Sequence, residues 1–435
     1  MFDSHFSSRA RLQALLEVEA ALAEAEAVVG VIPRQAARSI RTCARVEDLD
    51  DALIESEAQL DGNEAIPLIR QLTAHVAATD KEAAGYVHWG ATSQDVIDTA
   101  LVLQLRTATA PVIEDLFRAG DAAAGHARRY VTTTMAGRTW LQQATPITFG
   151  LKAAGWCDAL DRAASDLQSA LNQALVLQFG GASGTLAALG DRGPAVAAEL
   201  GRRLDLAVPP IPWHAHRERL ASLACAFGIA SGTAGKIGRD LGLLAQTEVG
   251  EAHEPDSSAG GSSAMPHKRN PVRAAVAIAG AVRSPGLVAT MLSAMVQEHE
   301  RGLGGWQAEW DTMPELVTIA GQSAAAIAGA LEALVVDPER MRANVNLTGG
   351  LMLAESVAMR LAPKMGKSDA HAAVKRAGQR AAAGESFADV LASDPAVSAI
   401  LDRSEIDQAL SPDHYLGSAE TFVAAVLSRR THRKK

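Results

Sequence analysis

The hydrophobic residues of the chain recur with the period of an α-helix over most of its length. The clearest example is residues 11–30, which end on a glycine and carry apolar side chains on one helical face: Leu12, Leu15, Leu16, Ala20 and Ala23. Positions three and four apart share a helix face, so this spacing predicts an amphipathic helix closed by Gly30. The sequence contains no convincing run of the alternating apolar and polar residues that mark a half-buried strand. The pattern therefore predicts an all-α fold.

The same periodicity predicts several further helices, some of them long. They are residues 50–78, broken near Gly62 and Pro67; 94–130, kinked or broken at Pro111; 222–248; and 273–301, with Pro285 inside. Breaks are expected at proline because it removes a backbone donor and clashes with the preceding turn. The most apolar long run, residues 317–336, is interrupted by Gln322, Ser323 and Glu332. It is expected to be buried in a bundle or between subunits rather than in a membrane.

The length of the chain predicts two or three domains, and we expect three. A chain of 435 residues is too long for one ordinary domain. Residues 1–93 are expected to form an N-terminal helical domain, and residues 94–343 a central long-helix bundle. Beyond Asn344 the helices shorten, and proline and charge become more regular. Residues 344–435 are therefore expected to form a small C-terminal helical domain.

Composition and charge narrow the class of protein. Hydrophobic residues make up 48% and aromatic residues only 4% of the chain, and alanine is abundant, which favours close helix packing. The net charge of −9 argues against a nucleic-acid partner, and the basic tail at residues 429–435 is expected to be a solvated terminus. The three cysteines lie far apart, so neither a disulfide framework nor a metal site follows from them. A reducing, cytoplasmic location is expected.

Four loops rich in small and polar residues interrupt the helical pattern: residues 87–95, 135–146, 178–185 and 257–271. Functional groups concentrate in loops that a rigid scaffold presents. The last loop contains GGSSAMPHKRNP, in which two glycines and two serines precede the cations Lys268 and Arg269. Glycine makes the backbone permissive, and lysine and arginine bind carboxylates. A plain solvated linker is the alternative interpretation, but such a linker has no need of the ordered MPHKRNP segment.

The stretch GSSAMPHKRNP closely resembles the signature of the fumarase/aspartase superfamily. The resemblance implies a three-domain, all-α fold, a homotetramer whose active sites are shared between chains, and chemistry at a bond β to a carboxylate. The catalytic serine of the signature maps to Ser262, which handles the proton on the carbon next to that carboxylate. Its lysine maps to Lys268, a second catalytic residue. Ser263, Met265 and Asn270 are expected to bind substrate beside them.

The loop at residues 87–95 begins the stretch VHWGATSQDVIDTA, which resembles the first conserved region of the same superfamily. The resemblance makes His88 a candidate catalytic residue, as proton carrier or as hydrogen-bond donor to the substrate. Thr92, Ser93 and Gln94 suit a carboxylate, because hydroxyl, amide and backbone donors gather at a helix start. The alternative is a plain helix cap with His88 packed beside it, and both interpretations can hold together.

The stretch GRTWLQQATP resembles the second conserved region, with one departure. Lyases of the superfamily usually carry a histidine where this chain has Trp140, and that histidine is the general acid for the leaving group. An indole N–H only donates a hydrogen bond and cannot act as that acid. The departing or attacking group should therefore need no protonation, a condition that a carboxylate meets. Trp140 and Gln142 are expected to line the substrate site.

Together with Trp140, the stretches LQFGGASGTLAALG, PWHAHRERL and QEHERGLGGW resemble one branch of the superfamily, the carboxymuconate cycloisomerases. The resemblance implies an enzyme that adds one carboxylate of a small tricarboxylate to a double bond of the same molecule and closes a lactone, without a cofactor. Arg301, in QEHER, is expected either to bind a carboxylate or to form a solvated ion pair on a helix.

Three alternatives stay open. One is another lyase of the superfamily, similar to adenylosuccinate lyase, against which Trp140 argues. Another is a cycloisomerase whose substrate is 3-sulfomuconate. The third is a non-catalytic structural protein on the same scaffold, against which Ser262, Lys268 and His88 argue. A metal site is not expected, because the two histidines of WHAHRERL point to different sides of a helix, and neither a nucleic acid nor a membrane is expected as partner.

Overall fold

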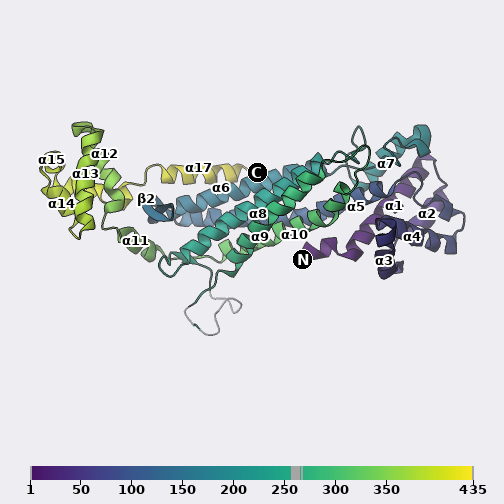
Figure 1. The fold of residues 1–435 in the computed structure, drawn as a ribbon, viewed down its shortest axis with the longest axis horizontal. Helices are drawn as coiled ribbons and strands as arrows, with labels where there is room; N and C mark the ends of the chain where they lie inside the picture. Colours follow the sequence, from purple (N-terminus) through teal and green to yellow (C-terminus); the bar gives the residue numbers. More distant parts are fainter. Residues whose placement is uncertain (1, 256–264, 266–267, 434–435) are drawn as a thin grey trace. The chain divides into compact units, whose positions relative to one another are not determined.

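The computed structural model describes residues 2–255, 265 and 268–433 (Figure 1). Within these residues the fold is helical apart from two small two-stranded sheets, which confirms the predicted all-α class. The chain divides into two compact units. The first comprises Met1–Leu116, Ala163–Gly235 and Ala279–Ala325, and the second comprises Phe117–Arg162, Lys236–Ile278 and Ala326–Lys435. The three-domain division inferred from helix length stays a prediction.

Five long helices contribute residues to both units: α5 (Ser93–Arg129), α6 (Phe149–Ala174), α8 (Glu218–Leu244), α9 (Val272–Ala294) and α10 (Gly305–Glu332). A break at Pro111 is not observed. Helix α5 continues through it, because the neighbouring Ala108 and Val112 are fully buried and one lost hydrogen bond does not outweigh that packing. The prediction that the helix starting near residue 273 continues to residue 301 is wrong. Helix α9 ends at Ala294, and the left-handed backbone of His299, with φ of 47°, is incompatible with a helix.

The first unit is completed by shorter elements: η1 (Phe2–Phe6), α1 (Ser8–Val29), α2 (Arg34–Cys43), η2 (Val46–Asp48), α3 (Asp51–Asp61), α4 (Ala65–Thr79), η3 (Ala83–Tyr86), η4 (Ala187–Arg192) and α7 (Gly193–Leu204). The predicted apolar face of α1 is buried, and the helix ends at Gly30 with a left-handed φ of 82°. The predicted break at Gly62 is confirmed. The break at Pro67 is wrong, because this proline lies in the first turn of α4, where backbone N–H groups have no partner within the helix.

The second unit contains both sheets and the C-terminal helices: β1 (Thr134–Thr139), β2 (Gln142–Thr148), β3 (Ala252–His253), β4 (Val335–Val336), α11 (Pro338–Asn346), η5 (Leu351–Leu353), α12 (Ala354–Met365), α13 (Lys367–Ala382), α14 (Phe387–Ser393), α15 (Pro395–Ser398), α16 (Arg403–Ala409), η6 (Pro412–His414) and α17 (Ala419–Arg433). Residues 135–146, predicted as a loop, form the antiparallel hairpin β1–β2 instead. Its turn consists of Trp140 and Leu141, with φ of 52° and 65°, the left-handed pair that suits the twist of a two-residue hairpin.

Glycines bring the long helices close together within each unit. In the first unit, a Cβ on Gly280 of α9 would clash with Ser323 of α10. In the second unit, a Cβ on Gly238 of α8 would lie 2.8 Å from the carbonyl oxygen of Ala274 in α9. Helices that approach this closely have no room for a larger side chain at these points. The structure therefore confirms the close helix packing expected from the alanine-rich composition.

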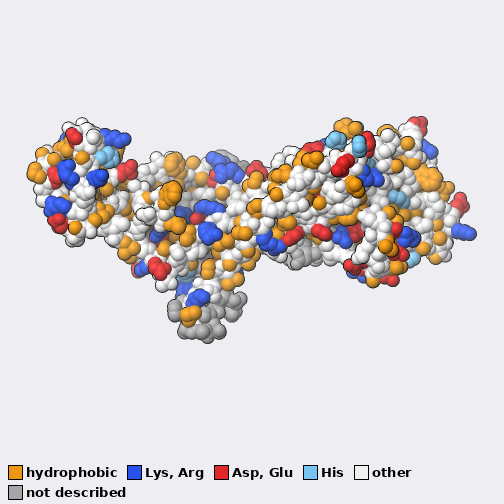
Figure 2. Space-filling model, in the orientation of Figure 1, with side chains coloured by type: hydrophobic (Ala, Val, Ile, Leu, Met, Phe, Trp, Pro, Cys, Tyr) orange, Lys and Arg blue, Asp and Glu red, His pale blue; other side chains and the backbone are white. Residues whose placement is uncertain are grey.

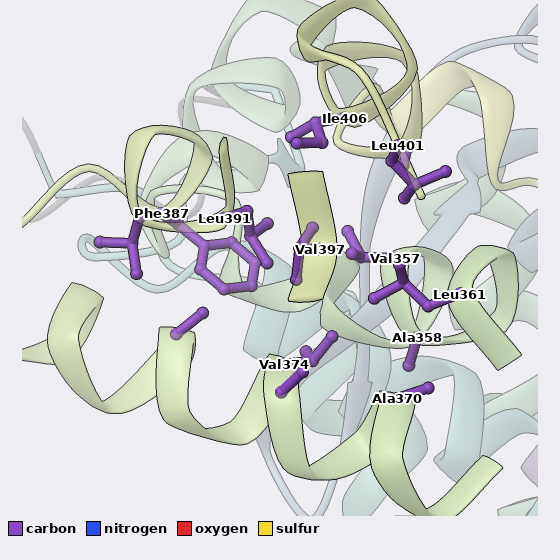
Figure 3. Close-up of a cluster of buried hydrophobic side chains, with 14 residues drawn as sticks. Val357, Ala358, Leu361, Ala370, Val374, Phe387, Leu391, Val397, Leu401 and Ile406 are labelled. Atoms are coloured by element: carbon purple, nitrogen blue, oxygen red, sulfur yellow. The ribbon is translucent and has the colours of Figure 1, made fainter. Parts of the chain in front are cut away.

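The shortening of the helices beyond Asn344 is also confirmed. Helices α12 to α16 are each shorter than α5 and enclose a separate hydrophobic cluster (Figure 3). In Figure 3, Phe387 and Leu391 of α14 lie across the cluster from Val357 and Leu361 of α12. All four side chains are at most 2% exposed, so this cluster gives the C-terminal helices a core of their own.

The surface of the described residues carries mixed charges and, on one long helix, exposed apolar side chains. On the face shown in Figure 2, acidic and basic side chains of the described residues are interspersed, as expected for a net charge of −9 spread over the chain. Three helices, α5, α8 and α9, are long and apolar enough to cross a membrane by length and composition alone. The most apolar window of α9 is only 22% buried, so this helix offers an apolar surface.

Candidate functional site

The carboxylate of Asp95 organises the start of α5 in the first unit. It accepts hydrogen bonds from the backbone N–H groups of Thr92, at 3.1 Å, and of Gly180 and Gly181, at 2.9 and 2.8 Å. The ring Nε2 of His214 lies 2.7 Å from the same carboxylate. Asp95 is 1% exposed. It therefore ties the polar loop at residues 87–95 to the glycine-rich loop at 178–185 and fixes both.

Gln94 links the start of α5 to Arg301. The fully buried amide of Gln94 donates through Nε2 to Asp98 Oδ2 at 3.1 Å and to the carbonyl oxygen of His214 at 2.9 Å. Its Oε1 accepts from Arg301 Nε at 3.1 Å. Both amide hydrogens and the oxygen of Gln94 are thereby engaged inside the protein. A substrate contact of Gln94 would have to replace one of these bonds, so the geometry suits Gln94 to orienting Arg301.

Arg301 itself lies in the loop between α9 and α10. Besides Gln94, its guanidinium donates to the carbonyl oxygen of Ala182 at 3.0 Å. Both of these partners are neutral. Within the part of the chain that the structure describes, the cation is therefore held in place without an acidic partner, which leaves it suited to an external carboxylate.

Gln94 contacts a buried ion cluster through Asp98. Arg217 donates to Asp98 at 2.6 Å and to Glu309 at 2.5 Å, and each of these three side chains is 1% exposed. Trp306 adds a bond from its indole Nε1 to Asp98 at 3.0 Å. Burial raises the pKa of Glu309 despite the attraction of Arg217, whereas Asp98 and Glu309 outweigh burial at Arg217 and raise its pKa. The arginine thus stays charged and holds the two acids.

His88 precedes this region on a strained backbone. Its φ is 57°, and its ring Nδ1 lies 2.6 Å from Oε1 of the fully buried Glu19 on α1. Burial alone lowers the pKa of His88, but the charge and hydrogen bond of Glu19, together with the charge of Asp95, outweigh it. The pKa of the imidazole is therefore raised above its ordinary value.

In the second unit, Trp140 and Gln142 lie at the tip of the β1–β2 hairpin. Trp140 is 96% exposed. The hairpin is anchored close to its turn, since Arg138 makes two bonds of 2.8 and 2.7 Å to the buried carboxylate of Glu251. Asn344 donates to the same carboxylate at 2.8 Å. The hairpin therefore presents an exposed indole on an ordered support.

Part of the signature stretch lies outside the described residues, including Ser262 and Ser263. Met265, Lys268 and Asn270 are described, and all three are exposed. The Lys268 N–H donates to the carbonyl oxygen of Met265 at 3.1 Å. Helix α9 then begins at Val272, where Glu254 accepts the N–H groups of the next two residues at 3.2 and 2.9 Å. The far end of the signature is thus anchored to a helix start.

Comparison with known proteins assigns the family. A family model described as Lyase matches residues 2–286, and one described as Adenylosuccinate lyase C-terminus matches residues 350–426. The chain belongs to this lyase family. It is 49% identical to 3-carboxy-cis,cis-muconate cycloisomerase of Pseudomonas aeruginosa over 97% of this chain and 93% of the relative. It is 48% identical to the enzyme of the same name from Bradyrhizobium diazoefficiens, over 96% of this chain and 93% of the relative.

A solved structure of this lyase family supports the same assignment. The crystal structure of 3-carboxy-cis,cis-muconate lactonizing enzyme from Pseudomonas putida is similar to the chain with a TM-score of 0.94 and 44% sequence identity. The likeness covers 100% of this chain and 97% of that one. The resemblance inferred from the conserved stretches is therefore confirmed.

The residues that support the site in this lyase-family chain were mostly not predicted. Sequence reasoning named His88, Gln94 and Arg301 but not the acidic residues that surround them. Glu19 carried a signal, because it is an acidic residue on the apolar face of α1. Asp95 stands next to the residues that were singled out. The pairing of Asp98 with Arg217 and Glu309 has no local signal, since the three lie on different helices or loops far apart in sequence.

Proposed function

We propose that the chain is a 3-carboxy-cis,cis-muconate cycloisomerase, an intramolecular lyase that forms 4-carboxymuconolactone. The observation that carries this proposal is the 49% identity to a cycloisomerase over 97% of the chain. A likeness of that extent includes all three conserved stretches rather than a single motif. Trp140 supports it, because an indole cannot protonate a leaving group and a carboxylate needs no such help.

The reaction needs carboxylate binding and one proton. An oxygen of one substrate carboxylate attacks a double bond of the same molecule, and a C–O bond forms. The electron pair of that double bond moves to the carbon next to another carboxylate, which delocalises it. A proton from the enzyme then forms a C–H bond at that carbon. Nothing leaves and nothing is oxidised or reduced, so the trianionic substrate becomes a dianionic lactone by gaining one proton.

Arg301 and the start of α5 contribute the first group of residues to the proposed site. Arg301 binds a substrate carboxylate, since no acidic side chain of the described residues pairs with it and its orientation is fixed by Gln94. Thr92 and Ser93 add hydroxyl donors where α5 begins, and the helix dipole favours an anion there. Donors fixed before the substrate arrives stabilise the developing negative charge without having to reorganise.

The signature stretch and the β1–β2 hairpin contribute a second group of residues. Lys268 provides a second cation for the tricarboxylate, and Ser263, Met265 and Asn270 are further candidates for binding it. Ser262 delivers the proton to the carbon, and His88 of the first unit is the second candidate for that step. Trp140 and Gln142 form a wall of the site.

The proposal also covers the oligomeric state, the cellular location and the pathway of the protein. We expect a homotetramer with active sites shared between chains, acting in the cytoplasm in the protocatechuate branch of the β-ketoadipate pathway, without cofactor, nucleic acid or membrane. The exposed hairpin tip supports shared sites, because an indole that is 96% exposed in one chain gains an apolar partner only from another chain or a ligand. The exposed apolar side chains of α9 support assembly: Val276, Val282 and Leu292, which are 41%, 72% and 47% exposed.

The experiment is a direct assay. Purified protein is mixed with 3-carboxy-cis,cis-muconate, without added metal or nucleotide, and the loss of the conjugated-diene absorbance is followed. Rapid loss of absorbance is expected. Parallel reactions with 3-sulfomuconate and adenylosuccinate test the two alternative substrates. If the carboxymuconate is stable in the presence of assembled protein while either alternative is consumed, the proposed substrate is wrong.

A variant of Arg301 tests its role. Arg301→Lys keeps the charge but cannot donate to Gln94 and Ala182 while also forking around a carboxylate, so KM is expected to rise about tenfold or more. The matched control is Arg403→Lys, because Arg403 is a half-exposed arginine among the C-terminal helices and pairs with Asp389 and Asp407. The control is expected to leave KM unchanged. An unchanged KM in Arg301→Lys would remove Arg301 from the carboxylate site.

A further inference from the structure

His88 and Glu19 form a pair that has one buried and one accessible side. The side chain of Glu19 is 0% exposed, whereas that of His88 is 18% exposed, and the two meet through Nδ1 and Oε1 at 2.6 Å. A carboxylate can only accept a hydrogen bond, so Nδ1 carries the hydrogen. The nitrogen left for an external group is then Nε2. A buried carboxylate that binds one imidazole nitrogen fixes both the tautomer and the orientation of the ring.

The backbone around His88 is held in a single arrangement. His88 has a left-handed φ of 57°, and the following Gly90 has φ of 72°. A Cβ on Gly90 would lie 2.8 Å from a methyl carbon of Leu189, so this segment packs tightly against the rest of the first unit. A strained residue that is held by its surroundings is a reason to suspect a function.

Glu26 shows what happens to the same kind of carboxyl without a histidine. It lies two turns along the same helix, α1, and is fully buried, and neither of its oxygens has a hydrogen-bond partner among the described residues. Burial, with the charge of Glu19, raises the pKa of Glu26 to about 9. Glu19 is equally buried and also has one unpartnered oxygen, but its other oxygen binds the imidazole. The contact with the His88 ring therefore distinguishes Glu19 from Glu26.

We propose that Glu19 is the positioning residue of His88: its buried carboxylate binds Nδ1 and holds the ring with Nε2 presented to the substrate. The protonated ring serves either role that His88 can have in the reaction, as proton donor to the carbon or as N–H donor to a carboxylate. Two acids favour the charged ring, Glu19 from α1 and Asp95 from α5. The inference rests on the proposed function for the identity of the substrate, but the geometry of the pair does not depend on it.

The first test needs no turnover. Histidine nitrogens are labelled with ¹⁵N, the signals of His88 are assigned with His88→Gln, and the ring is titrated by NMR. In the wild type the ring is expected to titrate above its ordinary pH. In Glu19→Gln the titration is expected to move down by about one pH unit or more, because the countercharge is gone while the shape is kept. The matched control is Glu26→Gln, which removes an equally buried acid from the same helix and is expected to leave the His88 titration in place.

The second test uses the pH profile of kcat/KM. If the protonated ring is required, kcat/KM falls as pH rises through the pKa of His88. Glu19→Gln is expected to move the midpoint of that fall to lower pH. Above both midpoints, kcat/KM is then about tenfold lower for each pH unit between them. Glu19→Asp keeps the charge on a shorter side chain and is expected to give an intermediate profile. Glu26→Gln is expected to reproduce the wild-type midpoint.

The outcomes separate the two claims. If the wild type leaves 3-carboxy-cis,cis-muconate unchanged but the His88 titration responds to Glu19→Gln as expected, the proposed function fails and the positioning pair stands. If the His88 titration is the same in wild type and Glu19→Gln, or moves as much in Glu26→Gln, Glu19 does not position the ring. An active enzyme whose pH profile is unmoved by Glu19→Gln overturns the requirement for a protonated ring.

Discussion

Glu26 predicts an unusual dependence of stability on pH. Its pKa is raised from 4.5 to about 9 by burial and by Glu19. The folded protein therefore holds a proton that the unfolded chain loses above about pH 4.5. The stabilisation of the folded state by the protonated Glu26 is complete below that pH and is lost as the pH rises toward 9. Between these limits the free energy of unfolding falls by about 1.4 kcal/mol per pH unit through this one group, or about 4 kcal/mol from pH 5.5 to 8.5.

Glu26→Gln isolates this effect, because glutamine has the same shape and does not titrate. Urea unfolding of variant and wild type, at one fixed protein concentration, is followed by circular dichroism at pH 5.5, 7 and 8.5. The stability of the variant relative to wild type is expected to increase by about 4 kcal/mol across this range. The constant cost of burying the amide cancels from that change.

The control for this experiment is an exposed acid of the same unit. Glu47, whose side chain is 61% exposed, pairs loosely with Arg45 at 3.9 Å. Glu47→Gln is expected to change the relative stability by less than about 0.5 kcal/mol at any of these pH values. If Glu26→Gln is as flat with pH as this control, Glu26 is ionised in the folded protein and the reasoning from its burial is refuted.

Two further predictions concern packing, and both are measured by urea unfolding at fixed protein concentration. Arg138→Lys replaces a two-bond contact to the buried Glu251 by a single charge and is expected to lower the free energy of unfolding by about 2 kcal/mol. The control, Arg162→Lys in an exposed ion pair, should lower it by less than about 0.5 kcal/mol. Equal losses of stability in the two variants would contradict the buried geometry of Arg138. Gly280→Ala is expected to cost about 1–3 kcal/mol because the added Cβ clashes with α10, whereas Gly155→Ala, which meets open space in α6, should stabilise by about 0.5–1 kcal/mol. A neutral Gly280→Ala would mean that α9 and α10 can separate at little cost.

The fold was largely predictable, because helical periodicity is a local property of the sequence. The long helices and the turns at Gly30 and Gly62 follow from it. The β1–β2 hairpin was not predictable in the same way, since Gly137 and Pro146 break the alternation that marks strands. The end of α9 at Ala294 was missed because the helical pattern continues into residues that the left-handed His299 excludes from the helix.

The residues expected to contact a substrate could be named from the sequence and stay predictions, whereas the buried residues that support them could not be named. The residues proposed to contact a substrate lie in short stretches whose residue types indicate their chemistry, such as the serines, lysine and asparagine of the signature. The supporting residues act through partners that come from elsewhere in the chain. Glu19 meets His88 across 69 positions, and Arg217 meets Asp98 across 119. A single sequence gives no means of pairing residues at that separation, although an acid on an apolar helix face, as at Glu19, indicates that a partner exists.

The cluster behind Gln94 also indicates why such charges are retained. Burying an arginine with two acids is costly, and apolar residues of similar volume are often as stable or more so. Stability alone therefore does not explain Arg217, Asp98 and Glu309. Asp98 also fixes the Nε2 of Gln94, and Gln94 in turn fixes Arg301. The cost is better explained by orientation, because a guanidinium set before the substrate arrives needs no rearrangement when charge develops in the reaction.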